Sequence, residues 1–120
     1  MIPRGCLLKV IDNSGARFAK VIGFYGQQGQ YGYVGDVVKV AIKDAKGDKV
    51  QSGTTKKAVI TETKFRQARP NGSHVQHLRN SCVLLSEKGA PLGNRIKGCL
   101  GFEFNKPRWR KLGLLSKRLF

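Results

Sequence analysis

The chain has 120 residues, of which 23 are Lys or Arg and 7 are Asp or Glu, so its formal net charge at pH 7 is +16. This length is typical of one domain, and a hydrophobic share of 40% can build a core, which excludes a wholly disordered chain. Because so cationic a body repels itself, the charge indicates a polyanionic partner, and it favours a nucleic acid over an anionic membrane or an acidic protein.

Short runs of β-type residues, separated by turn signals, fill the first part of the chain. Residues 6–11 predict a strand that ends in a tight turn at residues 12–15, where Gly15 is expected to take a positive φ. Residues 17–25 predict a second strand. Residues 26–35 are rich in Gly, Gln and Tyr, which indicates a loop or a flexible hairpin tip.

The middle of the chain predicts two clearer strands. In residues 36–43, Val and Ile alternate with Lys39 and Lys43, which indicates one buried face and one lysine-bearing face. Residues 45–49 form a charged turn, and residues 57–64 predict the next strand.

A proline-containing turn separates these strands from the last one. At residues 70–73, Pro presets the turn and Asn-Gly supplies a positive φ. Residues 75–85 contain another strand, which is richest in apolar residues at 82–85. Residues 89–93 then predict a turn, and residues 95–98 a short extended piece.

The tail, residues 105–120, changes to a helical period. Its apolar stripe, at spacings of three or four, is formed by Trp109, Leu112, Leu115 and Leu119. Asn105 is expected to cap this basic helix, and Pro107 fits its first turn. We therefore predict a single all-β, barrel-like domain over residues 1–120, with the barrel in 1–104 and a short C-terminal helix in 105–120.

The sequence offers no set of residues for catalysis, metal binding or a cofactor. Its cysteines, Cys6, Cys82 and Cys99, are odd in number and form no C-x-x-C pair. His74 and His77 are three residues apart, so on a strand they face opposite sides and cannot share a metal. The glycines of residues 26–32 lack the Lys-Ser/Thr and the helix of a phosphate-binding loop.

Two basic clusters are candidates for RNA contact rather than a merely solvated surface. The first brackets the Pro-Asn-Gly turn and consists of Lys56, Lys57, Lys64, Arg66, Arg69 and Arg79. The second fills the tail and consists of Lys106, Arg108, Arg110, Lys111, Lys117 and Arg118. Phe65 and Trp109 are interleaved with these cations, as suits phosphates and unstacked bases. Arg66 and Arg69 are expected to project beyond the sheet, where they reach phosphates.

A series of short motifs in a fixed order carries the most specific signal. The motifs are residues 9–16 (KVIDNSGA), 35–43 (GDVVKVAIK), 57–64 (KAVITETK), 69–73 (RPNGS), 80–85 (NSCVLL) and 91–98 (PLGNRIKG). In order and spacing they resemble the universal large-subunit ribosomal protein L14 family over nearly the whole chain. The chain departs from that family at His77, where an aromatic is usual, in residues 24–33 and in the tail.

The resemblance implies a small closed five-stranded barrel with C-terminal helical turns and a structural, non-enzymatic role in the large ribosomal subunit. The implied partners are large-subunit rRNA, small-subunit rRNA through an inter-subunit bridge, neighbouring large-subunit proteins through a shared sheet, and a ribosome-silencing factor. A free-standing barrel that binds single-stranded nucleic acid is the alternative. The residues expected to contact rRNA are Arg17, Lys20, Lys43, Lys56, Lys57, Lys64, Arg66, Arg69, Arg79, Arg95, Lys97, Arg108, Arg110 and Lys111.

The departures from the family pattern and the basic, apolar tail favour a mitochondrial ribosome over a bacterial or plastid one. No apolar run approaches the roughly 18 residues of a membrane span. No secretory signal or transit peptide precedes the strand at residues 6–11, which fits a bacterial protein, a trimmed import product or a chain made inside the organelle, and we favour the last interpretation.

Overall fold

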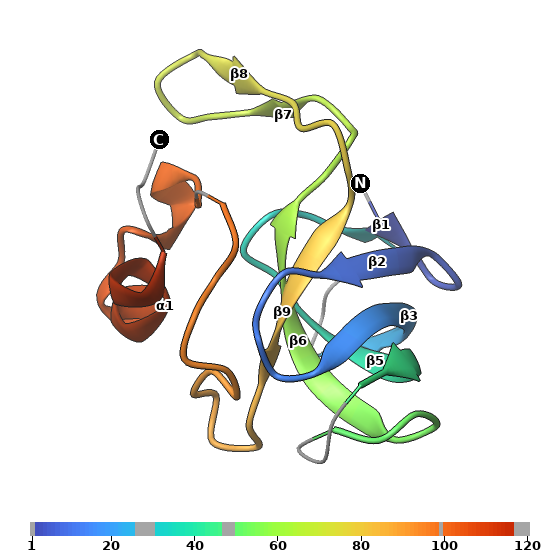
Figure 1. The fold of residues 1–120 in the computed structure, drawn as a ribbon. Coiled ribbons are helices and arrows are strands. Elements are labelled where there is room, and N and C mark those ends of the chain that lie inside the picture. Colours follow the sequence, from blue (N-terminus) through green and yellow to red (C-terminus); the bar gives the residue numbers. More distant parts are fainter. Residues whose placement is uncertain (1, 26–30, 47–49, 99, 117–120) are drawn as a thin grey trace.

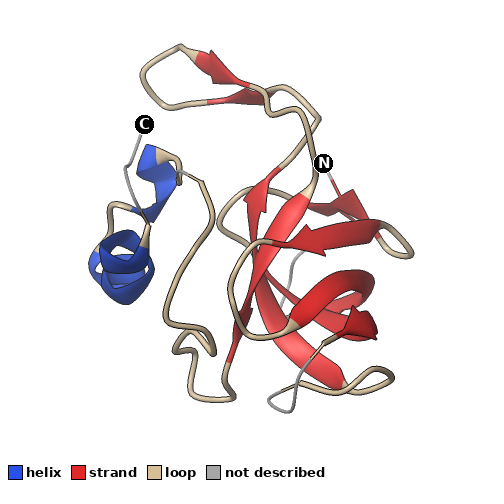
Figure 2. Cartoon of the chain, in the orientation of Figure 1, coloured by secondary structure: helices blue, strands red, loops and turns tan. Residues whose placement is uncertain are grey.

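The computed structural model describes residues 2–25, 31–46, 50–98 and 100–116. Its strands are β1 (Ile2–Pro3), β2 (Leu7–Val10), β3 (Ala16–Phe24), β4 (Tyr31–Gly32), β5 (Val37–Ala45), β6 (Thr55–Glu62), β7 (Gln67–Ala68), β8 (His74–Val75) and β9 (Ser81–Leu85). Its helical segments are the 3-10 turns η1 (Phe102–Phe104) and η2 (Pro107–Trp109) and the helix α1 (Arg110–Leu115). The barrel lies on one side and the helical tail on the other, and the β7–β8 hairpin projects above the barrel towards the tail (Figures 1 and 2).

Five strands close into a barrel in the order β2-β3-β5-β6-β9, which confirms the predicted all-β barrel with a short C-terminal helix. Neighbouring strands are antiparallel except where the barrel closes, because β2 pairs with β9 in parallel, Lys9 beside Ser81 and Val10 beside Cys82. Irregular register between β3 and β5 and between β6 and β9 bends these strands, as closure of a small barrel requires.

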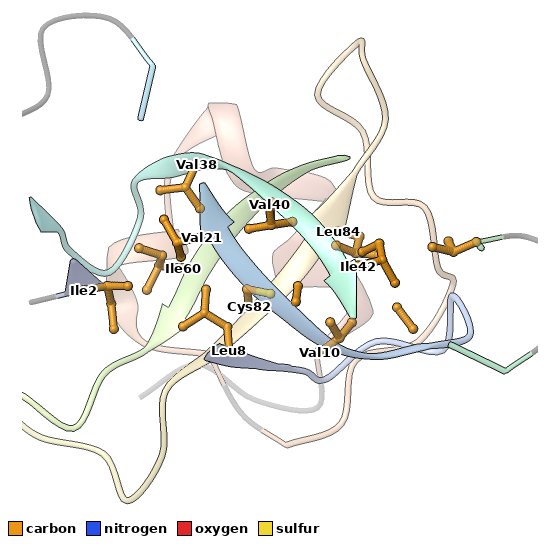
Figure 3. Close-up of a cluster of buried hydrophobic side chains, with 14 residues drawn as sticks. Ile2, Leu8, Val10, Val21, Val38, Val40, Ile42, Ile60, Cys82 and Leu84 are labelled. Atoms are coloured by element: carbon orange, nitrogen blue, oxygen red, sulfur yellow. The ribbon is translucent and has the colours of Figure 1, made fainter. Parts of the chain in front are cut away.

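Alternation along each strand fills the barrel with aliphatic side chains. Val38, Val40 and Ile42 of β5 point inward and are buried, while Lys39 and Lys43 point outward, as predicted. The same alternation brings inward residues of the other strands into one cluster (Figure 3). Buried aliphatic side chains therefore form the barrel interior, whereas the lysines of β5 lie on its outer surface.

The tail covers a second apolar cluster on the outer face of β6 and β9. All of β9 is buried because Cys82 and Leu84 face the barrel interior whereas Val83 and Leu85 face the tail. Trp109 and Leu112 are buried against this outer face, and Leu115 packs against it, which confirms the predicted stripe as far as the described residues extend. Leu119 lies outside them.

The predicted start of the tail helix is wrong. Pro107 does lie in a first turn, but that turn is the 3-10 segment η2, and α1 begins only at Arg110. Lys106 occupies the N-cap of η2 without a side-chain cap, so Asn105 is not the cap. No helix in the described parts of the chain is long and apolar enough to span a membrane.

Two predicted turns are confirmed and one predicted loop is corrected. Gly15 has φ +104° and Gly72 has φ +87°. Tyr31–Gly32, expected in a loop, instead forms β4 and pairs with β1. Gly32 fits there because a Cβ would lie 2.6 Å from Cδ1 of Ile60. Residues 26–30 and 47–49 of the predicted loop and charged turn lie outside the described residues.

Candidate nucleic-acid interface

Most of the residues predicted to contact RNA are exposed, but they do not form one patch. The exposed ones are Arg17, Lys20, Lys43, Lys64, Arg66, Arg95, Lys97, Arg108, Arg110 and Lys111, and the half-buried ones are Lys56, Lys57, Arg69 and Arg79. They fall into groups on the outer face of β3 and β5, on the β7–β8 hairpin, on the segment before η1 and on the tail. Cys99, Lys117 and Arg118 lie outside the described residues.

Ion pairs engage three of the predicted arginines. Arg69 donates from Nε to Glu103 at 2.9 Å and from Nη2 at 3.4 Å, with both side chains only 19% exposed. The expectation that Arg69 projects from the hairpin towards phosphates is therefore wrong, because its guanidinium turns back to the base of the tail. Arg79 similarly approaches Glu62 at 3.3 Å. Arg17 lies 3.8 Å from Asp44, both well exposed, which is a loose surface pair.

The tail and the turn before it enclose a cationic groove. Its two hollows, of about 350 and 310 Å³, share Lys88 and Gly89 of the turn and Arg108 and Trp109 of η2. Arg110 and Lys111 line the first hollow. Sequence reasoning missed Lys88, which has no signal of its own because only the fold brings residues 86–91 against η2.

Trp109 is unavailable to bases, contrary to the prediction. It is 5% exposed, and its ring contacts Phe104 edge-on at a centroid distance of 5.9 Å. The guanidinium of Arg108 covers the ring at 4.7 Å. Trp109 thus anchors the tail and holds Arg108 in place, whereas Arg108 has its donors left for a phosphate. The other predicted aromatic, Phe65, is 49% exposed on the hairpin side of the barrel beside Lys64 and Arg66.

Backbone hydrogen bonds to Asn13 and Ile11 position the segment that carries Arg95 and Lys97. The side-chain oxygen of Asn13 accepts hydrogen bonds from the backbone N–H groups of Asn94 at 2.8 Å and Arg95 at 3.1 Å. The backbone N–H of Lys97 donates to the carbonyl of Ile11 at 2.8 Å. These bonds fix the segment to the turn after β2 and leave both basic side chains in solvent.

The buried polar groups are structural rather than catalytic. Asp12 accepts hydrogen bonds from the hydroxyl and the N–H of Ser14 and from the N–H of Leu84. Burial raises the pKa of Asp12 despite these donors, and burial also raises the pKa of the Cys82 thiol. In the described ranges, no group of three or more His, Cys, Asp or Glu side chains could hold a metal ion. The exposed Lys and Arg side chains equip the surface to bind anions.

Comparison with known proteins agrees with this geometry. The family described as Ribosomal protein L14p/L23e matches residues 1–120. The large ribosomal subunit protein uL14 of Aquifex aeolicus (strain VF5) is 37% identical over 118 residues, which cover 97% of each chain. Its counterpart from Aquifex pyrophilus is 36% identical over the same share. The chain therefore belongs to the ribosomal protein L14 family and is a structural, non-enzymatic constituent of the large ribosomal subunit.

Proposed function

We propose that the chain binds large-subunit rRNA mainly through its tail groove, the groove between residues 86–91 and residues 107–112 defined above. The observation that carries this proposal is the set of exposed cations that line the groove, Lys88, Arg108, Arg110 and Lys111. Glu87 is the acid at its edge. Phosphate contacts of this kind set the register of a protein on RNA.

Other predicted cations add positive charge elsewhere on the surface. Arg95 and Lys97 are held on the segment whose Ile96 packs in the same buried cluster as Trp109. Lys64 and Arg66 add charge on the hairpin side, whereas Arg69 and Arg79 contribute through the ion pairs that position their neighbours. Lys56 and Lys57 are half-buried, and Lys57 donates to the carbonyl of Glu87 at 3.4 Å, so it supports the wall of the groove.

Filter binding to a fragment of large-subunit rRNA tests this proposal. The double variant Arg110→Ala/Lys111→Ala should weaken binding by about tenfold or more without lowering the melting temperature, since both side chains are exposed. Arg4→Ala/Lys46→Ala, which removes two exposed cations outside the groove, is the charge-matched control. Equal affinity of the double variant and the unaltered chain would show that the groove is not part of the RNA interface.

We further propose the finer placement that the family suggests. The chain lies at the subunit interface, bridges to small-subunit rRNA, contacts a neighbouring large-subunit protein through a shared sheet and receives a ribosome-silencing factor. The two-residue strands β7 and β8 support the shared sheet, because a hairpin that extends from the barrel offers strand edges to a partner. Cross-linking mass spectrometry of intact ribosomes should link Lys64 to another large-subunit protein; links confined to this chain would contradict the shared sheet.

We also propose that the ribosome in question is mitochondrial. The apolar and basic tail, with Leu114 76% exposed beside Arg110 and Lys111, supports an additional protein contact there. The relatives named above are bacterial, so a bacterial-type ribosome is the competing placement. Labelling with cytosolic and organellar translation blocked separately, followed by sequencing of the native N-terminus, distinguishes a chain made inside the organelle from one that is imported. Continued labelling while organellar synthesis is blocked would rule out a chain made inside the organelle.

A further inference from the structure

The outer face of β2, β3 and β5 carries apolar side chains and lysines that the tail leaves uncovered. The β2–β3 register places Leu7 beside Lys20 and Lys9 beside Phe18. Leu7 is 52% exposed, Phe18 38% and Ile22 41%. Because the tail covers β6 and β9, this face lies across the barrel from α1 (Figure 1). We call this surface the lysine face; its members are Leu7, Lys9, Phe18, Lys20, Ile22, Lys39 and Lys43.

Strand β5 makes the lysine face more cationic. Its outward lysines, Lys39 and Lys43, are exposed, and Lys39 pairs in register with Gly23. The acidic residue of the three strands is Asp44, which lies 3.8 Å from Arg17. Because Arg17 pairs with Asp44, the four lysines of this face keep its charge positive.

Aromatic rings occur at both ends of β3 on this side. Phe18 lies near its start, between Lys9 and Asp44 in register. Tyr25 follows its end, 37% exposed, with Nζ of Lys57 5.3 Å from the centre of its ring. Lys57 pairs in register with Lys39, so this second ring borders the lysine face. A sheet face that combines exposed rings with cations is a platform on which bases stack while lysines bind the phosphates.

The mixture of side chains favours RNA over a protein partner. The cores of protein–protein interfaces are depleted in lysine, whereas lysines here separate one apolar side chain from the next. Duplex RNA is the weaker candidate, because side chains cannot read its narrow major groove and its bases are not free to stack on a ring. Unpaired nucleotides expose both a base face and a phosphate.

We propose that the lysine face binds an unpaired segment of rRNA, with Phe18 against a base and Lys9, Lys20, Lys39 and Lys43 on the phosphates. This inference rests on the proposed function and adds a second RNA site, on the strands that the tail leaves uncovered, which approaches the tail groove at Lys57. One chain then joins two RNA segments. The tail groove holds one segment mainly by charge, and the lysine face holds the other by charge and by stacking on Phe18.

Fluorescence anisotropy with the full chain tests the inference, with oligouridine of about 12 nucleotides as the unpaired probe and a duplex RNA of equal length. Phe18→Ala should weaken oligouridine binding about fivefold or more and leave duplex binding unchanged. Tyr33→Ala, which removes an exposed ring outside β2, β3 and β5, is the matched control and should leave oligouridine binding unchanged. Equal losses in the two variants, or no loss in Phe18→Ala, would overturn the proposal.

A second variant distinguishes a loss of RNA binding from a loss of folding. Lys20→Ala removes an exposed side chain and should also weaken oligouridine binding, at an unchanged melting temperature. The groove variant Arg110→Ala/Lys111→Ala should instead weaken duplex and rRNA binding while keeping most oligouridine affinity. Unchanged oligouridine binding in the Lys20 variant would therefore contradict the lysine face alone, and unchanged rRNA binding in the groove variant would contradict the tail groove alone.

The same face can be examined inside the subunit. A photoreactive benzoyl-phenylalanine at position 18 should cross-link to RNA when purified large subunits are irradiated. A cross-link to a protein instead would assign the lysine face to a protein neighbour and overturn the proposal.

Discussion

Replacement of Gly15 by alanine should destabilise the barrel more than the same replacement at another glycine of positive φ. Gly15 has φ +104° and Gly53 has φ +84°, so a Cβ at either position costs about 1–2 kcal/mol of backbone strain. Their surroundings differ: at Gly15 the Cβ would collide with the carbonyl oxygen of Lys46, whereas at Gly53 nothing lies within 4 Å.

The collision has its own energetic consequence. Lys46 donates its N–H to the carbonyl of Gly15 at 2.6 Å, which closes the end of the β3–β5 ladder. A shift of the Lys46 backbone that relieves the collision also breaks or weakens this bond, for about 1 kcal/mol. Gly15→Ala should therefore lose about 1 kcal/mol or more beyond the loss in Gly53→Ala.

Urea denaturation followed by fluorescence measures this difference, because the chain has a single tryptophan and Trp109 is buried against the barrel. Far-ultraviolet circular dichroism should give the same midpoints, which checks that one transition is observed. Equal losses in the two variants would refute the collision, and no loss in either would refute the strain.

Other predictions concern the tail, the hairpin and pH. Arg69→Ala should lower the free energy of unfolding by about 1–3 kcal/mol, since it leaves half-buried Glu103 without its bidentate donor, whereas exposed Arg66→Ala should leave it unchanged; a reversed order in urea melts would contradict the pairing. Leu112→Ala should cost about 2–5 kcal/mol and expose the tail to limited proteolysis, and wild-type cleavage rates would contradict its anchoring role. Because the folded state binds the Asp12 proton more tightly than the unfolded state, the stability of the unaltered chain relative to Asp12→Asn should rise as pH falls from neutral towards 3.8, and a flat difference would refute the raised pKa. RNA affinity should fall roughly 10³–10⁵-fold between 50 and 200 mM salt if 6–10 phosphates are engaged, and a flat titration would contradict a charge-driven interface.

Local patterns in the sequence predict the parts of the fold that depend on periodicity. The alternation around Lys39 and Lys43, the apolar run at 82–85 and the spacing of Trp109 and Leu112 all correspond to the burial that the structure shows. Each of these patterns reports which face of an element meets the core.

Contacts between distant parts of the chain leave no such pattern. Arg69 meets Glu103 across 34 positions, and Asn13 meets Asn94 across 81. The sequence therefore predicts that Arg69 is basic but not that it is engaged, and it cannot show that Lys88 joins the tail groove. Phe18 and Lys20, in contrast, could have been assigned to one outward face had the bulges of β3 not blurred its alternation.

Co-sedimentation with ribosomal subunits tests the central claim most directly. An affinity-tagged chain expressed in its own cells should migrate with the large subunit in a sucrose gradient, remain there after the subunits are separated, and occur in about one copy per particle. The groove variant Arg110→Ala/Lys111→Ala should shift towards the top of the gradient, while the charge-matched Arg4→Ala/Lys46→Ala chain stays with the large subunit. Recovery of the unaltered chain only in the free-protein fractions, or only with the small subunit, would contradict the account.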